Sequence, residues 1–312
     1  MRIVFFGSPD AALPSLRKLL DGGHSVELVI TQPDRPAGRG RRMTPSAVKS
    51  FAQVHGIPVL EPVRIRQDET VLPRIREARP DIHVVVAYGQ IIPGPVIYFP
   101  RHHSVNVHFS LLPKYRGAAP VQWTVLNGET ETGVTIIELN EKMDEGDILA
   151  EARTPIGPRE TAAELETRLA AMGADLLLKT LEGIGCIKPV PQDKARATLA
   201  PKLRKEDGLV DWSQSASSID RRVRALAGRP GTYTFFRGQR IRIHGGRILE
   251  MSAEGRKPGE IISALKNGLA VACGGGSVYL IEVLQAEGKT RLSAYQFSLG
   301  AKIRPGEELG AD

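Results

Sequence analysis

The sequence of 312 residues has few cysteines and no long hydrophobic run. Its two cysteines, Cys186 and Cys273, form no CxxC pair, which argues against a disulfide framework or a cysteine zinc site and fits a reducing cytoplasm. No stretch approaches the roughly 18 consecutive apolar residues that a membrane span needs. The N-terminal MRIVFFGSPD lacks the apolar region and cleavage site of a signal peptide. We therefore expect a cytoplasmic protein without a membrane segment, in which both cysteines are packing residues.

Several common ligand motifs are also missing. The turn after the first apolar segment reads GSPDAA, without GxGxxG or GxxxxGK[ST], so no phosphate cradle for NAD or ATP is indicated. The stretch PAGRGRRM follows a proline-rich loop and does not open a helix directly, which argues against a P-loop there. No GxSxG elbow of a serine hydrolase is present. His102 and His103 lack carboxylates at helical spacing, so we predict no metal site.

Basic residues exceed acidic ones mainly in the last third of the chain. The formal net charge is +7 at pH 7. Residues 201–312 hold 18 Lys and Arg against 12 Asp and Glu, whereas residues 1–200 hold 24 against 23. This division fits either an ordinary, slightly basic surface or a polyanionic partner that the last third helps to hold.

The first 185 residues alternate strand and helix signals. Apolar segments such as RIVFFG, SVELVIT and DIHVVVAYG predict strands, and PDAALPSLRKLLDGG predicts one of the helices between them. TGVTIIEL and GDILAEARTPI predict two further strands that pair as neighbours. This order predicts an α/β domain with a mostly parallel, doubly wound sheet and helices on both of its faces.

The character of the sequence changes after Pro189. Residues 189–205 are polar and rich in proline, which predicts a linker. A basic helix, SQSASSIDRRVRALAG, then precedes short strands separated by glycine turns, a pattern typical of a small β-barrel. We therefore predict an α/β domain over residues 1–188, a linker over 189–205 and a C-terminal β-barrel domain over 206–312.

Two polar side chains stand at the end of a predicted buried strand in SVNVHFS. Asn106 and His108 are two residues apart and point to the same face, at the end of the strand where α/β sheets bind ligands. They are either a satisfied structural pair or a site that acts on a developing oxyanion, Asn as a donor and His as a donor or proton carrier. Such a histidine needs a carboxylate, for which ELNEKMDEGDI offers Asp144, with Asp147 as the rival.

The motifs NVHFSLLPKYRGAAP and MDEGDI resemble the formyltransferase family that uses 10-formyltetrahydrofolate. ITQPDRPAGRGRRMTPSAVK is similar to the basic loop of its methionyl-tRNA formyltransferase branch, VVVAYGQIIP to the folate-side strand and turn, and APKLRKEDGLVDWSQSA with AGRPGTYTFF to the start of the C-terminal domain. The resemblance implies a Rossmann-like catalytic domain followed by an OB-like, tRNA-binding barrel. It also implies transfer of a formyl group from 10-formyltetrahydrofolate to the α-amine of initiator methionyl-tRNA for translation initiation, without a metal.

The resemblance implies roles for individual residues. Asn106, His108 and Asp144 match the catalytic residues of the family. The implied folate-binding residues are Ser110, Leu111, Leu112, Pro113, Tyr88, Gly89 and Gln90. The expected tRNA-binding residues are Arg39, Arg41 and Arg42 of the basic loop, together with Lys114, Arg116, Arg240 and Arg242. The last two arginines alternate in RGQRIRI and would share one exposed strand face. Phe109 stands where the family commonly has a small residue, which leaves the shape of the pocket mouth open.

Other functions remain open at this point. A formyltransferase acting on a small amine, such as a nucleotide-linked amino sugar, would use the same three catalytic residues. So would a hydrolase that releases formate from 10-formyltetrahydrofolate. The basic loop and the basic last third favour a tRNA substrate over both. An RNA-binding module with an inactive transferase domain would lack one of the three residues, and all are present. We expect the protein to be a monomer.

Overall fold

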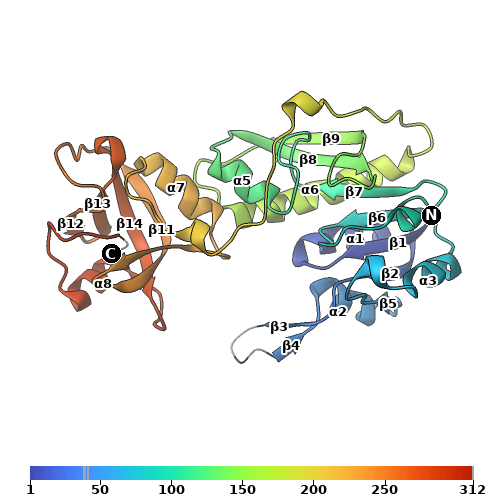
Figure 1. Cartoon of the computed structure of the whole chain (residues 1–312), viewed down its shortest axis with the longest axis horizontal. Helices are drawn as coiled ribbons and strands as arrows, with labels where there is room; N and C mark the ends of the chain where they lie inside the picture. Colours follow the sequence, from blue (N-terminus) through green and yellow to red (C-terminus); the bar gives the residue numbers. More distant parts are fainter. Residues whose placement is uncertain (38–39, 41, 311–312) are drawn as a thin grey trace. The chain divides into compact units, whose positions relative to one another are not determined.

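The computed structural model describes residues 1–37, 40 and 42–310, and its elements are shown in Figure 1. The described chain divides into two units. The first consists of Met1–Pro120, Glu131–Ile156 and Leu165–Pro201. The second contains Lys202 to the end of the chain and also two earlier segments, Val121–Thr130 and Gly157–Glu164, which the sequence analysis had placed in the N-terminal domain.

The first unit contains a seven-stranded sheet in the order β5-β2-β1-β6-β7-β8-β9. Five strands run parallel: β1 (Arg2–Gly7), β2 (Ser25–Ile30), β5 (Val59–Leu60), β6 (Ile82–Val86) and β7 (Ser104–His108). The strands β8 (Glu131–Glu138) and β9 (Ile148–Pro155) pair antiparallel at one edge. Every residue of β6 and β7 is buried, as expected of a parallel sheet that is covered on both faces. The predicted mostly parallel sheet is confirmed.

Helices pack on both faces of this sheet. One face buries Val4, Phe6 and Val85 against α3 (Val71–Ala78) and α4 (Gly94–Ile97). The opposite face carries α6 (Ala162–Glu182), whose Gly173 lies so close to β7 that a Cβ there would be 2.8 Å from Cγ1 of Val107. Other helical elements of the first unit are α1 (Leu13–Asp21), α2 (Ala47–Val54), η1 (Asp10–Ala12), η2 (Ile65–Gln67) and η3 (Lys194–Arg196). All of α5 (Pro120–Leu126) after its first residue belongs to the second unit. Because Asn106 alternates with Val107, its side chain points away from α6.

The basic loop of the first unit contains a small hairpin. Its strands, β3 (Arg35–Ala37) and β4 (Arg42–Thr44), pair antiparallel. Arg42 is exposed, as are the two residues that follow it. Arg39 and Arg41 lie outside the described residues.

The second unit contains an antiparallel sheet in the order β10-β11-β14-β13-β12, with β15 beside β14. The chain's last described residues connect the two edges. Leu309 N–H donates to the Gly259 carbonyl over 2.8 Å, and Gly310 N–H donates to the Phe235 carbonyl over 3.0 Å. This closure agrees with the predicted C-terminal barrel. The elements are β10 (Thr232–Phe236), β11 (Gln239–Leu249), β12 (Ile261–Leu265), β13 (Gly268–Ala272), β14 (Val278–Ala286), β15 (Leu292–Ser293), α7 (Ala216–Ala225), α8 (Ala294–Ala301), η4 (Glu206–Gly208) and η5 (Gly274–Gly276).

Residues 190–200, predicted as part of a linker, are bound along the first unit, and we call this segment the strap. Val190 and Ile148 exchange two backbone hydrogen bonds of 2.8 and 2.9 Å. Further along, Arg116 N–H donates to the Thr198 carbonyl over 2.9 Å, and Ala200 N–H donates to the Arg116 carbonyl over 2.7 Å. The strap is polar, and its Leu199 is 77% exposed. Backbone hydrogen bonds, rather than the burial of apolar side chains, therefore hold the strap in place.

The two cysteines differ in their surroundings. Cys273 is buried in the core of the second unit, where burial raises the pKa of its thiol to about 12. Cys186 is exposed, so the predicted packing role is wrong for this residue. Within the described part of the chain, no helix combines the length and apolar character needed to cross a membrane.

The buried His83 makes the stability of the fold depend on pH. Burial lowers the pKa of His83 to about 3, whereas an unfolded histidine titrates near 6.5. Below pH 6.5 the unfolded chain therefore binds a proton that the folded chain excludes, and stability falls as the pH decreases toward 3. We expect His83 to account for about 2 kcal/mol of lost unfolding free energy between pH 7.5 and pH 5.

Urea unfolding of His83→Leu at both pH values should show this loss reduced by about that amount. His55→Gln, which replaces an exposed ring, is the matched control. An unchanged pH dependence in His83→Leu would contradict the assignment.

Candidate active site

The end of β7 presents two buried polar side chains on one face of the sheet. Asn106 is 9% exposed and His108 is 5% exposed. The His108 Nε2–H donates to the Tyr115 carbonyl over 3.0 Å. Among the described residues, none forms a hydrogen bond with the Asn106 side-chain amide. Asn106 can therefore use its amide N–H groups for a bound molecule.

The structure brings Asp144 to His108. The loop after β8 places Asp144 Oδ1 3.7 Å from His108 Nδ1. The other carboxylate oxygen, Oδ2, accepts a hydrogen bond of 2.8 Å from Gly117 N–H. A carbonyl can only accept, so the contact with Tyr115 assigns a proton to Nε2 and leaves Nδ1 facing the carboxylate. A proton taken up at Nδ1 would lie between the ring and Asp144, which allows the pair to accept and release one proton.

The alternative carboxylate, Asp147, has a different position. Its carbonyl accepts a hydrogen bond of 2.9 Å from Glu138 N–H, which closes the loop at its base. Gly146 passes so close to this strand end that a Cβ atom there would be 1.7 Å from the Glu138 carbonyl oxygen. Only glycine permits this approach, and it helps to direct Asp144 toward β7.

The turn after β7 is built on the hydroxyl of Thr135 in β8. This hydroxyl donates to the Ser110 carbonyl over 2.7 Å and accepts from Leu112 N–H over 3.1 Å. Ser110 is fully buried, and its own hydroxyl donates to the Lys114 carbonyl over 2.7 Å. Leu112 is buried, whereas Leu111 and Pro113 are half-buried. The predicted folate segment 110–113 is thus a fixed turn beside His108.

Arg116 requires a correction. It was expected to meet tRNA, but it is 7% exposed and its guanidinium binds within the site. Nε and one terminal nitrogen donate to Gln192 Oε1 over 3.1 and 2.8 Å, and the other terminal nitrogen lies 3.3 Å from Glu145 Oε1. A buried charge must be paired in this way. Arg116 therefore joins the turn after β7 to the Asp144 loop.

The segment 88–90 presents mainly backbone to its surroundings. The Tyr88 ring is buried in the core against Phe6, which raises the pKa of its hydroxyl. The Gln90 amide is occupied by Ile65 N–H and the Pro62 carbonyl. Gly89 has φ +79°, and a Cβ there would be 2.5 Å from Gln32 Nε2. The side chains of Tyr88 and Gln90 are therefore used by the fold.

Phe109 does not point to the same side as His108. Its ring is buried, with Cε1 only 3.5 Å from the position that a Cβ of Gly173 would occupy in α6. Strand alternation directs Phe109 with Val107 to the α6 face. The large residue is accommodated by the helix glycine, on the face opposite to Asn106.

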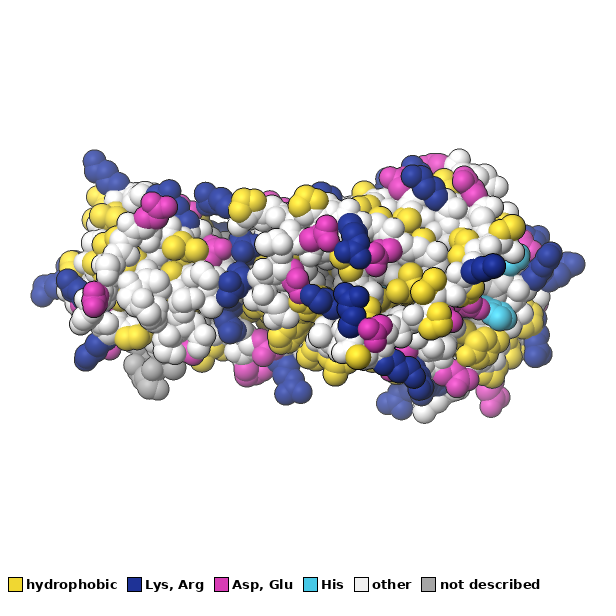
Figure 2. Space-filling view, turned by 90° about the horizontal axis from the view of Figure 1, so that it is seen from above, with side chains coloured by type: hydrophobic (Ala, Val, Ile, Leu, Met, Phe, Trp, Pro, Cys, Tyr) yellow, Lys and Arg dark blue, Asp and Glu magenta, His cyan; other side chains and the backbone are white. Residues whose placement is uncertain are grey.

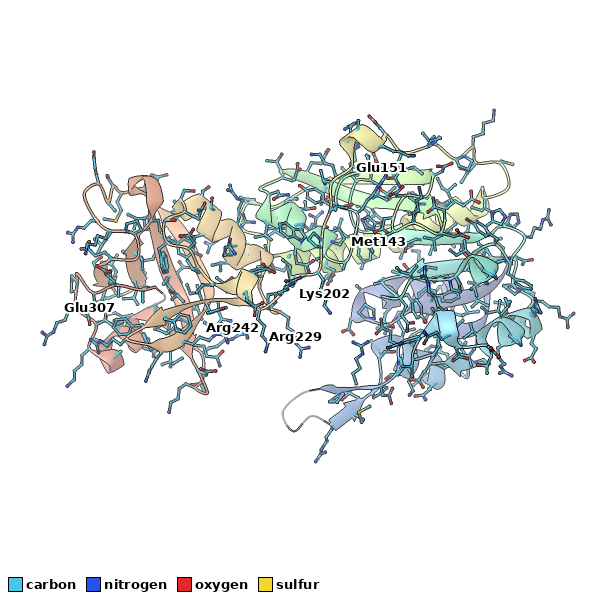
Figure 3. The ribbon with its side chains drawn as sticks, in the orientation of Figure 1. Met143, Glu151, Lys202, Arg229, Arg242 and Glu307 are labelled. Carbon is cyan, nitrogen blue, oxygen red and sulfur yellow. The ribbon has the colours of Figure 1, made fainter. Side chains whose placement is uncertain are left out.

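The remaining basic candidates are placed separately. Arg240 stacks on the Tyr233 ring, with its guanidinium carbon 3.9 Å from the ring centroid. Arg242 donates to the carbonyls of Gly228 and Pro230, and burial and nearby arginines lower its pKa. Both are half-buried, and Figure 3 labels Arg242 close to Arg229 in the second unit. On the face that Figure 2 shows, acidic side chains lie beside many of the basic ones. Lys114 is half-buried on the turn after β7.

The sequence analysis missed Thr135 and Gln192. Thr135 is one polar residue within an apolar strand, and Gln192 lies in a segment that reads as a linker. Neither belongs to a recognised motif, and only their distant partners reveal what they do. The available sequence signal for Thr135 was a threonine between apolar residues in TGVTIIEL.

Two family models match the chain: formyl transferase over residues 1–181, and the C-terminal domain of formyl transferase over residues 202–302. A methionyl-tRNA formyltransferase of Geotalea uraniireducens is 47% identical over 312 residues, covering 99% of this chain and 98% of the relative. That of Solibacter usitatus is 46% identical over 312 residues, covering 99% of both chains. The chain belongs to the methionyl-tRNA formyltransferase family. The resemblance indicated by the motifs is confirmed, and with it the assignment as a formyltransferase.

Solved structures share the fold of this methionyl-tRNA formyltransferase family member at lower identity. HypX from Aquifex aeolicus, in complex with tetrahydrofolic acid, has a TM-score of 0.66 and 20% identity, covering 96% of this chain and 47% of HypX. WlaRD, a sugar 3N-formyltransferase solved in the presence of dTDP and 5-N-formyl-THF, has a TM-score of 0.67 and 19% identity, covering 93% of this chain and 99% of WlaRD. At these identities the likeness supports the formyltransferase fold.

Proposed function

We propose that this chain formylates the α-amino group of initiator methionyl-tRNA from 10-formyltetrahydrofolate, in the cytoplasm and as a monomer. The observation that carries the proposal is the grouping of Asn106, His108 and Asp144 at the carboxyl end of β7, with the His108–Asp144 contact at 3.7 Å. The relatives that cover almost the full length of the chain are named methionyl-tRNA formyltransferases, which supports methionyl-tRNA as the acceptor. The small-amine alternative rests only on relatives of about one fifth identity.

The first chemical step forms a bond between the α-amine nitrogen and the formyl carbon. The formyl oxygen then carries negative charge, and donors that are already in place stabilise such an oxyanion. The Asn106 amide has no partner among the described residues, so its N–H groups supply one donor. His108 lies on the same face of β7, and we assign the second donor to its Nε2–H, which must exchange the Tyr115 carbonyl for the oxyanion. Both groups are buried, which strengthens their interaction with the charge.

The second step breaks the bond between the formyl carbon and N10 of the folate. The amine must lose one proton, and N10 must gain one. We assign both proton transfers to the His108–Asp144 pair, which accepts the first proton and delivers the second, directly or through a water molecule. The reaction then balances without a covalent enzyme intermediate, and no nucleophilic side chain is needed.

We assign the folate to the turn 110–113 and to the backbone of residues 88–90. These two segments follow the neighbouring parallel strands β7 and β6. The tRNA is assigned to exposed basic groups outside this pocket. Arg42 on β4 is the best placed of the described candidates, because it is exposed on the hairpin. Arg39 and Arg41 belong to the same loop. Lys114, Arg240 and Arg242 remain candidates for phosphate contacts, and Arg116 is removed from this set.

Formyl transfer can be measured with three acceptors: initiator methionyl-tRNA, elongator methionyl-tRNA and free methionine. With 10-formyltetrahydrofolate as the donor, we expect formylmethionine on the initiator tRNA at a rate far above that of the other two. Formate release without acylated product, or formylation of a small amino sugar, would overturn the proposed substrate.

His108→Ala and Asp144→Ala should each reduce kcat by about 10²–10⁴-fold, because each removes a group that acts on the reacting atoms. The KM for 10-formyltetrahydrofolate should change little, since the folate segment remains. Initial rates over a range of folate concentrations test both statements. Turnover near the wild-type level in either variant would remove that residue from catalysis.

Arg42→Ala should weaken tRNA binding because it removes one phosphate contact. Each such contact contributes about one unit to the slope of log affinity against log salt concentration. Filter binding between 50 and 200 mM salt, values chosen to span this effect, measures the slope. Arg66→Ala, which changes an exposed arginine outside the hairpin, is the control. An Arg42→Ala slope equal to that of the control would exclude the contact.

A further inference from the structure

Gln192 of the strap lies beneath the loop that carries Asp144. It is 9% exposed, and its Nε2 donates to two main-chain carbonyls of that loop. These hydrogen bonds reach the Asp144 carbonyl over 2.8 Å and the Gly146 carbonyl over 2.7 Å. The Gln192 amide therefore holds the loop on both sides of Glu145. These two hydrogen bonds fix the path of the backbone from which the Asp144 side chain projects.

The orientation of the Gln192 amide is determined by its partners. Arg116 can only donate, and both of its hydrogen bonds end on Gln192 Oε1. The loop carbonyls can only accept, so the Nε2 end must face them. A reversed amide would set an oxygen against two carbonyl oxygens and an NH₂ group against a guanidinium. The arrangement therefore has one state, and Arg116 selects it.

Asp144 depends on this support. Its φ of +53° is uncommon for a residue with a side chain, so the surroundings must hold the backbone there. The carboxylate is fixed at Oδ2 by Gly117 N–H, and Oδ1 faces His108. The side-chain contact positions one oxygen, whereas Gln192 holds the backbone from which the side chain projects. Loss of the Gln192 hydrogen bonds would therefore change the distance between Asp144 and His108.

We propose that Gln192 is a positioning residue for catalysis, which acts by holding the Asp144 loop in register with His108. This proposal rests on the proposed function, because it assigns a role through Asp144. Gln192 lies on the strap, and the strap also binds the turn after β7 through Arg116. One surface segment thereby keeps both catalytic loops at a constant separation.

Two substitutions separate the contacts of Gln192. Gln192→Glu keeps an oxygen for Arg116 but cannot donate to the loop carbonyls. Gln192→Met keeps the approximate volume and removes all of the hydrogen bonds without adding charge. A misplacement of about 1 Å can cost about 100-fold, so we expect kcat to fall about 10- to 100-fold in both variants. Gln53→Glu, an exposed change on α2, is the matched charge control and should keep wild-type kcat.

Measurements of folate binding and of the KM for methionyl-tRNA exclude a merely structural effect. Tetrahydrofolate titrations should give a dissociation constant within about threefold of wild type for both Gln192 variants, because the folate segment does not contact Gln192. The KM for methionyl-tRNA should likewise be retained. A fall in kcat with unchanged folate binding shows that the variant is folded and that the reacting groups are misplaced.

The decisive measurement is a double-mutant cycle. In the Asp144→Ala background, Gln192→Met should cause no further loss of formyl transfer, because the residue it positions is gone. A further loss as large as in the wild-type background would overturn the proposal. So would wild-type kcat in both single variants. Activity retained in Asp144→Ala itself would remove Asp144 from catalysis and overturn this proposal with it. If wild-type protein formylated no methionyl-tRNA, the proposed function would fail instead, so the two failures are distinguishable.

Discussion

The buried guanidinium of Arg116 is the interaction on which the site depends. A charge with so little exposure is tolerated only when its donors are paired, and its partners, Glu145 and Gln192, come from two other segments. Removing Glu145 leaves the buried charge uncompensated, and removing Gln192 leaves two of its donors unpaired, so the three segments support one another. His108 and Asp144 already lie 3.7 Å apart in this arrangement. Their separation is set by the same network that satisfies Arg116.

The sheet supplies the fixed base for this network. β7 is buried on both faces, and strand alternation alone places Asn106 with His108 and directs Val107 to α6. Thr135 on the neighbouring β8 then ties down the turn that follows. Rigid strands thus hold Asn106 and His108, whereas a glycine-containing loop holds Asp144. This division fits the proposed direct transfer, in which only protons move between protein and substrate.

Periodicity and residue spacing were sufficient to predict much of the fold. Alternating apolar segments predicted the parallel sheet, and the two-residue spacing of Asn106 and His108 predicted their shared face. Other features depend on contacts between distant residues and left no local signal. Arg116 reads as a surface cation until Glu145 and Gln192 are placed beside it. The polar composition of the strap predicts a linker. The size of Phe109 predicts a narrowed pocket mouth, whereas the structure packs its ring against Gly173 of α6.

The strap has a consequence for how such enzymes can be recombined. It occupies residues 190–200, between the matched family regions that end at 181 and begin at 202, and so belongs to neither. If C-terminal domains were exchanged between relatives with a crossover at residue 185, the whole strap would come from the other relative. The positions of Gln192 and Thr198 beside the candidate site would then be filled by that relative's residues. A crossover after Pro201 keeps each centre with its own strap. The segment that must be kept together with the candidate site therefore extends beyond the last strand of the α/β sheet, to Pro201.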